Sequence, residues 1–145
     1  MIRKAQAADL DQIADLWLAA NIDAHDFIDA SYWQSMAPLV RGLLAQSELT
    51  IFEAAYGGRI LGFVGLDGDQ LQGLFVDADV RGQGLGRQLL DAAKKDRAHL
   101  SLHAYAKNTR ACAFYSREGF IATGEDVDAA TGEREVIFEW QASAI

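Results

Sequence analysis

The stretch Val-Arg-Gly-Gln-Gly-Leu-Gly-Arg, residues 80–87, decides how this chain is interpreted. It follows an apolar run at residues 74–76 and opens a segment, residues 85–93, whose apolar side chains have helical spacing. The first backbone N–H groups of a helix lack partners within it, and the helix dipole favours negative charge there. Glycines also let the backbone curl closely around a ligand. We therefore expect a phosphate-bearing ligand at this loop, with Arg81 and Arg87 adding positive charge at its two ends.

The spacing of the glycines excludes two common nucleotide sites. A P-loop ends in Gly-Lys followed by Ser or Thr, whereas this loop ends in Gly-Arg-Gln at residues 86–88. A dinucleotide fingerprint has the spacing G-x-G-x-x-G and an acidic residue about 20 positions further on. Here the third glycine comes one residue early, and the position about 20 beyond Gly84 is Ala104. What remains is the pattern Arg-x-x-Gly-x-Gly, from Arg81 to Gly86.

A second motif lies downstream, in Asn-Thr-Arg-Ala-Cys-Ala-Phe-Tyr-Ser-Arg-Glu-Gly-Phe, residues 108–120. Asn108 or Thr109 can cap a short helix, its apolar side chains share one face, and Gly119 supplies a C-terminal stop. This stretch matches the pattern N-x-x-A-x-x-F-Y-x-x-x-G-F. The two motifs, in this order, closely resemble the two signatures of the GNAT superfamily of N-acetyltransferases.

The resemblance implies acetyl-coenzyme A as co-substrate, with no metal. In that family the glycine loop cradles the pyrophosphate, and the Asn of the second motif contacts the pantetheine arm. The residues expected to bind the cofactor are Leu74, Phe75, Val76, Arg81, Gly82, Gln83, Gly84, Leu85, Gly86, Arg87 and Asn108.

Tyr115 is the expected proton donor, because the family places this Tyr beside the thioester sulfur. A phenol has an ordinary pKa of about 10 and a thiol one of about 8.5, so protonating the departing thiolate is downhill. By spacing alone, Tyr115 would be a core aromatic of a short helix. A backbone N–H around Phe75 or Val76 is expected to stabilise the oxyanion, since strands of the family bulge there. Residues 77–78 would place that bulge just before the loop.

Two interpretations of the general base remain open. Several members of the family carry a glutamate five residues before the Asn, and His103 stands at that position here. An imidazole can accept the ammonium proton directly or through a water. Strand alternation puts His103 on the face opposite Leu100 and Leu102, toward the expected cleft. The other interpretation is a half-buried histidine that only packs. A ping-pong scheme through Cys112 is disfavoured, because nothing nearby in the sequence activates this thiol.

The acceptor is expected at the segment between two N-terminal helices, which carries His25, Phe27, Tyr32 and Trp33. His25 is also a second candidate for the base. Aromatic rings can enclose an alkylammonium group by cation–π contact, although helix-spaced aromatics more often belong to the core. With residues 38–41, this segment is similar to small single-domain bacterial GNAT proteins linked to lysine acetylation of proteins. We therefore expect a primary amine of a protein lysine as acceptor. The alternatives are a small-molecule amine, or a coenzyme A-binding sensor without turnover.

The composition of the chain limits the kinds of protein and partner that remain possible. The 145 residues predict a single domain, 1–145, and half of them are apolar, which is enough for a core. One cysteine excludes an internal disulfide, and no apolar run approaches 18 residues, so a cytoplasmic protein without membrane contact is expected. A net charge of −8 argues against nucleic acid and favours a cationic acceptor. A monomer and a homodimer both remain open.

The predicted fold is α/β: the GNAT fold, a mixed central sheet of about seven strands flanked by four helices. In the helix expected at residues 32–46, Leu39, Val40, Leu43 and Leu44 are predicted to face inward, with a kink or break at Pro38. Asp9 is expected to cap the first helix. The remaining helices are expected at residues 85–98 and just after Asn108, and strands at residues 2–5, 50–55, 59–66, 70–76, 100–105, 121–127 and 133–140.

Overall fold

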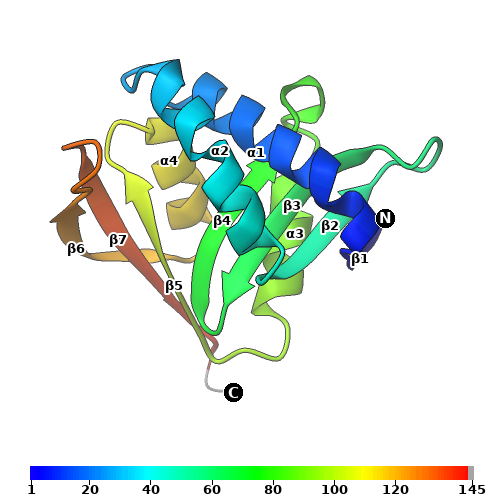
Figure 1. The fold of residues 1–145 in the computed structure, drawn as a ribbon. Helices are drawn as coiled ribbons and strands as arrows, with labels where there is room; N and C mark the ends of the chain where they lie inside the picture. The colour runs from blue at the N-terminus through cyan, green and yellow to red at the C-terminus, as the bar shows by residue number, and fades with distance from the viewer. Residues whose placement is uncertain (144–145) are drawn as a thin grey trace.

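Seven strands form one sheet in the order β1-β2-β3-β4-β5-β7-β6, in a computed structural model that describes residues 1–143 (Figure 1). Neighbouring strands are antiparallel except β4 and β5, which run parallel, so the predicted mixed sheet is confirmed. The strands are β1 Ile2–Lys4, β2 Glu48–Glu53, β3 Ile60–Asp67, β4 Gln70–Val76, β5 His99–Tyr105, β6 Ile121–Val127 and β7 Arg134–Gln141.

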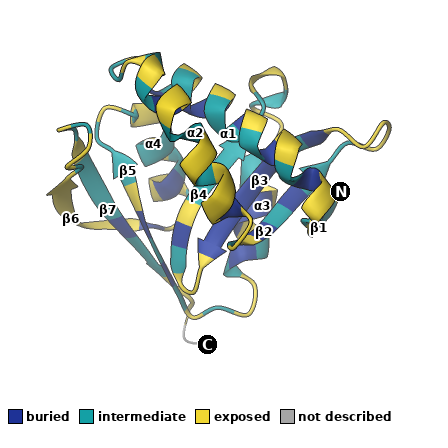
Figure 2. Ribbon diagram, viewed as in Figure 1, coloured by how far each residue is buried: buried dark blue, intermediate teal, exposed yellow. Residues whose placement is uncertain are grey.

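Four α-helices cover the two faces of this sheet, as predicted. They are α1 Leu10–Ala24, α2 Ala30–Leu44, α3 Leu85–Lys94 and α4 Thr109–Arg117. Helices α1 and α2 lie on one face, in front of the sheet in Figure 1, and α3 and α4 pack on the other. Each face has its own core, one centred on Ile13 and Phe63 and the other on Leu89 and Leu102. Figure 2 shows the buried residues concentrated on β3 and on the inner sides of the helices.

Strand β3 is buried on both sides, which explains its nearly continuous apolar sequence. Gly62 lets helix α3 approach this strand closely. A Cβ there would lie 2.9 Å from the backbone oxygen of Phe75 and 3.0 Å from Leu89 Cδ1. The lack of a side chain at Gly62 therefore lets the middle of α3 pack directly against β3.

Strands β4 and β5 separate soon after they meet. Among the described residues, they pair in parallel only at Gln70 and Ser101. The predicted bulge at residues 77–78 is wrong. The pairing of β4 with β3 instead slips by one residue at Gln72, because Gly65 pairs with Gly73 while Leu66 pairs with Leu71. Residues 78–80 form a 3-10 turn in which the Asp77 carboxylate accepts from the Asp79 N–H at 2.9 Å.

Helix α2 departs from the sequence prediction in which side it buries. It runs without a break from Ala30 to Leu44, and Pro38 lies within it. Leu39 and Leu43 are 58% and 56% exposed, so the prediction that they face inward is wrong. The buried line instead follows Trp33 and Leu44, with Val40 packed against the same core. These three lie on one stripe of a helix.

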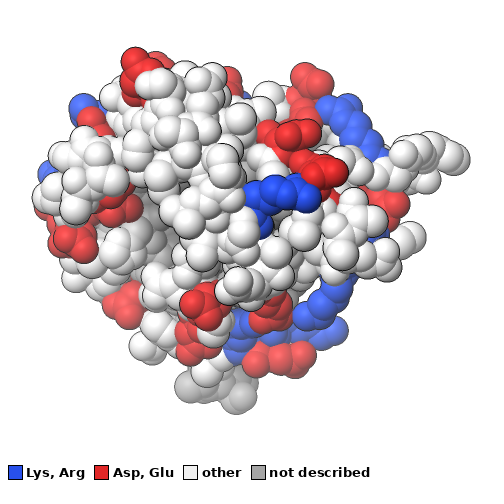
Figure 3. Space-filling model, in the orientation of Figure 1, with Lys and Arg blue, Asp and Glu red and all other residues white. Residues whose placement is uncertain are grey.

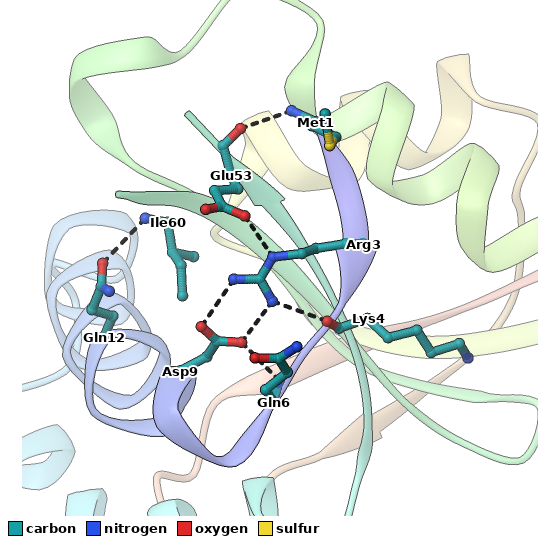
Figure 4. A network of polar contacts seen from close by, with 8 residues as sticks. All are labelled: Met1, Arg3, Lys4, Gln6, Asp9, Gln12, Glu53 and Ile60. Carbon is teal, nitrogen blue, oxygen red and sulfur yellow. Dashed lines mark hydrogen bonds and ion pairs between the residues drawn. The ribbon is translucent and has the colours of Figure 1, made fainter. Parts of the chain in front are cut away.

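Asp9 ties the N-terminal strand to the first helix instead of capping that helix (Figure 4). Its carboxylate accepts from Arg3 at 2.8 and 3.0 Å and from the Gln6 N–H at 2.7 Å. Arg3 also donates from Nε to Glu53 at 2.5 Å, which reaches the end of β2. The Arg3 guanidinium holds the pKa of Asp9 below its usual value. This network ties the short edge strand β1 to the end of β2 and to the turn that precedes α1.

We predict that Asp9→Ala lowers the free energy of unfolding by about 1–3 kcal/mol, because it leaves the Gln6 N–H and one side of Arg3 unpaired. Urea denaturation at neutral pH measures the change. Lys4→Ala is the matched control. Lys4 lies on β1, beside Arg3, and the substitution removes only its exposed ion pair with Glu48 of β2. A loss in Asp9→Ala no larger than in this control would contradict the prediction.

Candidate active site

A cleft of about 1100 Å³ opens where β4 and β5 separate. Its lining comes from the end of β4, the glycine loop, α3, α4 and the last turns of α1. Of the eleven residues predicted to bind the cofactor, ten line this cleft. Gln83, which is exposed, does not line the cleft. Two motifs that are separate in the sequence therefore form opposite walls of one cavity.

The charge of the cleft is opposite in sign to that of the protein. Five basic side chains line it against two acidic ones, although the whole chain has 13 basic and 21 acidic residues. The sequence prediction named only Arg81 and Arg87 among them. The others, which sequence reasoning missed, are Lys94, Arg110 and Arg117. A concave basic surface on an acidic protein favours an anionic ligand.

The glycine loop has the backbone geometry of an anion site. Gly82 and Gly84 have φ values of 76° and 83°, and Gly84 is the N-cap of α3. A Cβ at either position would meet no atom within 4 Å, so it is the backbone conformation that requires glycine. The first N–H groups of α3 therefore open into the cleft at the positive end of the helix.

Arg81 and Arg87 are both engaged by carboxylates. Arg81 donates to Asp23 of α1 at 2.5 Å, and its guanidinium lowers the pKa of that carboxyl. Arg87 lies 3.5 Å from Glu118, at the end of α4. The two arginines therefore connect the glycine loop to its neighbours in addition to bringing positive charge to the cleft.

Strand β4 presents free backbone groups toward the cleft. The Asp77 N–H donates to the Leu61 oxygen at 2.8 Å, which places residue 77 among those that bond to β3. Alternate residues of an antiparallel strand bond to the same neighbour, so Phe75 also faces β3. Leu74 and Val76 therefore direct their N–H and C=O groups toward β5, across the gap. Of the two oxyanion donors expected from the sequence, this geometry favours Val76.

Tyr115 lies on α4 with its ring in the core and on the wall of the cleft. Its ring centroid is 5.2 Å from that of Phe114 and 5.4 Å from that of Phe120. Burial raises the pKa of Tyr115 above its usual value, so the phenol keeps its proton at neutral pH. The structure thus gives this residue both the core packing and the cleft position that the sequence left as alternatives.

Asn108 and His25, which both line the cleft, are in contact with each other. The Asn108 Oδ1 accepts from the Ala111 N–H at 3.2 Å and caps α4, as the sequence predicts. The Asn108 Nδ2 lies 3.1 Å from His25 Nε2. His25 follows the last residue of α1 and is buried, and this burial lowers its pKa. The sequence did not predict this contact.

The four residues predicted to bind the acceptor gather into one aromatic group. The His25 ring stacks on Trp33 with centroids 5.3 Å apart, and Phe27 and Tyr32 meet this pair edge-on. Trp33 is only 6% exposed and belongs to the core, whereas Phe27 and Tyr32 reach the surface. Trp33 therefore supports the group from below and offers little surface to an acceptor.

Tyr105 completes the aromatic group, and the sequence prediction missed it. Its ring lies 5.0 Å from that of His25, and its hydroxyl donates to Asp128 at 2.5 Å. The sequence did contain a signal for Tyr105, because strand alternation places it on the same face of β5 as His103. This hydrogen bond joins the aromatic group to the turn between β6 and β7. Figure 3 shows acidic side chains on this side of the molecule and also elsewhere on the same face.

His103 lies on the predicted face of β5 but outside the lining of the cleft. Leu100 and Leu102 are buried beneath the helices of the opposite face, as expected. The His103 Nδ1 lies 3.7 Å from a carboxylate oxygen of Glu135 on β7. Burial raises the pKa of Glu135, with the charge on His103 acting in the opposite direction. The sequence prediction did not include Glu135.

Cys112 has a structural environment. Its Sγ lies 3.6 Å from the backbone oxygen of Tyr105, and burial raises the pKa of its thiol, which disfavours the reactive thiolate. Within residues 1–143, no cluster of three or more His, Cys, Asp or Glu side chains has the arrangement of a metal site. In the same part of the chain, no helix combines the length and apolarity needed to span a bilayer.

The fold and the two motifs on facing walls define a class of protein. Residues 47–122 match the acetyltransferase (GNAT) domain family, and the chain belongs to that family. This confirms the family predicted from the two motifs.

Individual relatives agree with this assignment. The chain is 38% identical over 122 residues to the peptidyl-lysine N-acetyltransferase YiaC of Escherichia coli (strain K12), which covers 83% of this chain and 82% of the relative. The solution structure of apo-form YjaB from Escherichia coli superposes with a TM-score of 0.86 at 28% identity, over 99% of this chain and 98% of that one. The PaiA N-acetyltransferase from Thermoplasma acidophilum, solved with coenzyme A, shares the fold with a TM-score of 0.80 at 18% identity, over 98% of each chain.

Proposed function

We propose that this protein transfers an acetyl group from acetyl-coenzyme A to the side-chain amine of a protein lysine. The observation that carries the proposal is that the glycine loop, the free edge of β4 and Tyr115 all line one basic cleft. The name of the relative YiaC, a peptidyl-lysine N-acetyltransferase, supports lysine as the acceptor.

The residues of the cleft fit the donor. The backbone N–H groups at residues 84–87 suit the pyrophosphate, and the basic lining suits its remaining phosphate charge. The unpaired edge of β4 and the amide of Asn108 suit the pantetheine arm, which carries amide groups of its own. Acetyl-coenzyme A supplies the chemistry of a thioester, whose carbonyl carbon an amine can attack and whose thiolate can leave.

Within the cleft, two groups of this chain would handle charge and protons. The Val76 N–H, which β3 does not use, is the donor that we assign to the carbonyl oxygen. Tyr115 is the acid that we assign to the departing sulfur. Because burial keeps its phenol protonated, it holds a proton to give at neutral pH. The buried ring contacts fix the direction of the hydroxyl.

The acceptor would enter on the face of the sheet that carries the aromatic group. Burial raises the pKa of the Tyr32 phenol, and the negative charges of Asp128 and Glu135 on the same side of the molecule raise it further. These carboxylates would attract an ammonium group. His103 lies beside Glu135 on that face, and we propose this pair as the acceptor of the ammonium proton, through water.

Release of free coenzyme A thiol, measured with acetyl-coenzyme A and a panel of lysine peptides, tests the proposed function. We expect release that depends on the peptide, with the acetyl group found on the lysine side chain by mass spectrometry. If only small amines support turnover, the acceptor is a small-molecule amine and not a protein lysine. Binding of acetyl-coenzyme A without turnover on any amine would make the protein a sensor and overturn the proposal.

Gly84→Ala should weaken binding of acetyl-coenzyme A, because a side chain strains the left-handed conformation that directs the loop N–H groups. The control is Gly57→Ala in the turn between β2 and β3, where φ is 82° and a Cβ also meets no atom within 4 Å. Both variants should lose similar stability, measured by thermal unfolding without ligand. Only Gly84→Ala should lose part of the rise in melting temperature that the ligand produces. If acetyl-coenzyme A raises the melting temperature equally in both variants, the glycine loop is only a turn and does not bind the ligand.

Tyr115→Phe should lower kcat by on the order of 10²-fold, since it removes the proton donor and keeps the ring that packs in the core. The Kd for acetyl-coenzyme A, measured by calorimetry, should stay near that of the wild type. Full turnover in this variant would remove Tyr115 from the chemistry.

His103→Ala should lower kcat/KM and remove the acidic limb of the pH–rate profile, because the imidazole must be neutral to accept a proton. His99→Ala is the matched control. His99 lies on the same strand and forms a similar pair with Glu139 of β7, with its Nε2 at 3.1 Å. If the two variants show the same pH–rate profile, the base lies elsewhere.

A further inference from the structure

The last turn of α1 contacts both walls of the cleft. Asp23 accepts from Arg81, which belongs to the glycine loop. Two residues later, His25 meets Asn108, which begins α4 on the opposite wall. One helix end thus reaches the two motifs on which cofactor binding is proposed to depend.

The orientation of the Asn108 amide fixes the role of each atom in the contact with His25. Since Oδ1 accepts from the Ala111 N–H, the nitrogen of the amide is the atom that faces His25. Nδ2 can only donate, so the His25 Nε2 must accept and the ring proton must sit on Nδ1. One of the two amide protons of Asn108 is then used, and the second stays free for a ligand in the cleft.

The His25 ring has little freedom to turn away from Asn108. Trp33 stacks on it at an interplanar angle of 29°, and Phe27 and Tyr105 pack against it at steeper angles. Its backbone N–H donates to the Asn21 oxygen at 3.0 Å, which fixes the residue to the end of α1. The acceptor nitrogen is therefore held in one direction.

Histidine is a poor choice for this position if packing is its only role. His25 is 7% exposed, and its Nδ1 has no hydrogen-bond partner among the described residues. A buried unpaired donor costs about 1–3 kcal/mol. A phenylalanine would fill the same aromatic group without that cost. The other ring nitrogen of His25, which lies 3.1 Å from Asn108 Nδ2, makes the contact that can offset this cost.

We propose that His25 is a positioning residue, which holds Asn108 in place for the cofactor while Asp23 holds Arg81 on the opposite wall. This inference rests on the proposed function, because it assigns a role in binding acetyl-coenzyme A. It also reassigns His25, which the sequence placed among the acceptor-binding residues. His25 acts through Asn108 and does not touch the reacting atoms.

The test measures acetyl-coenzyme A binding and thermal stability in the same variants, without acceptor. His25→Phe keeps an aromatic ring and removes the acceptor nitrogen. It should raise the Kd for acetyl-coenzyme A by about tenfold, which corresponds to the loss of one hydrogen bond, while the melting temperature stays the same or rises. His25→Gln, whose side-chain oxygen can accept from Asn108, should recover part of the affinity. Trp17→Phe is the control, because Trp17 packs on Trp33 at 5.8 Å and is absent from the cleft lining.

A double-mutant cycle separates positioning from packing. If His25 acts through Asn108, His25→Phe should change the Kd little in an Asn108→Ala background. Equal effects in both backgrounds would overturn the inference, as would an unchanged Kd in His25→Phe. Nitrogen NMR of the histidine rings should find the proton of His25 on Nδ1, and a proton on Nε2 would also overturn it. Failure of the wild type to bind acetyl-coenzyme A would instead overturn the proposed function.

Discussion

The separation of β4 from β5 is the constraint on which the rest of this structure depends. Two parallel strands that share one described residue pair leave a row of backbone N–H and C=O groups without strand partners. Such groups are costly inside a protein unless water or a ligand satisfies them. The gap therefore offers an extended polar ligand the hydrogen bonds that a neighbouring strand would have made, as the proposed function requires. The glycine loop and α4 stand at the two sides of this gap.

Holding such a gap open requires support from outside the sheet. Helix α3 is fixed against β3 through the close approach at Gly62. Helix α4 is fixed by the aromatic contacts of Tyr115, which explains why a residue assigned to the chemistry is also part of the core. The end of α1 then spans the gap on the other face. The charges follow the same division, since basic side chains line the cofactor cleft and acidic ones gather near the proposed acceptor entrance.

The errors of the sequence prediction have identifiable physical causes. Leu39 and Leu43 have helical spacing, but spacing alone does not say which of several apolar stripes is buried, and the fold buries the stripe that carries Trp33 and Leu44. Aspartate is a common helix cap, but the carboxylate of Asp9 accepts hydrogen bonds from Arg3 and is therefore part of an ion-paired network instead. The role of His103 stays a prediction: it lies on the predicted face of its strand, but strand alternation gives only a face and not a distance to the cleft. The bulge in β4 depends on its pairing with β3, which local sequence does not encode.

The sequence by itself determined the family, the glycine loop at the start of α3, the cap and stop of α4 and the strands near the cleft. These follow from contiguous residues, because helix starts, glycine turns and strand alternation depend on interactions over a few positions. Only the tertiary structure decided which residues support the site. Asp23 meets Arg81 across 58 positions and His25 meets Asn108 across 83. No local pattern encodes such pairs, since each requires the folded sheet to bring a helix end to both walls of the cleft.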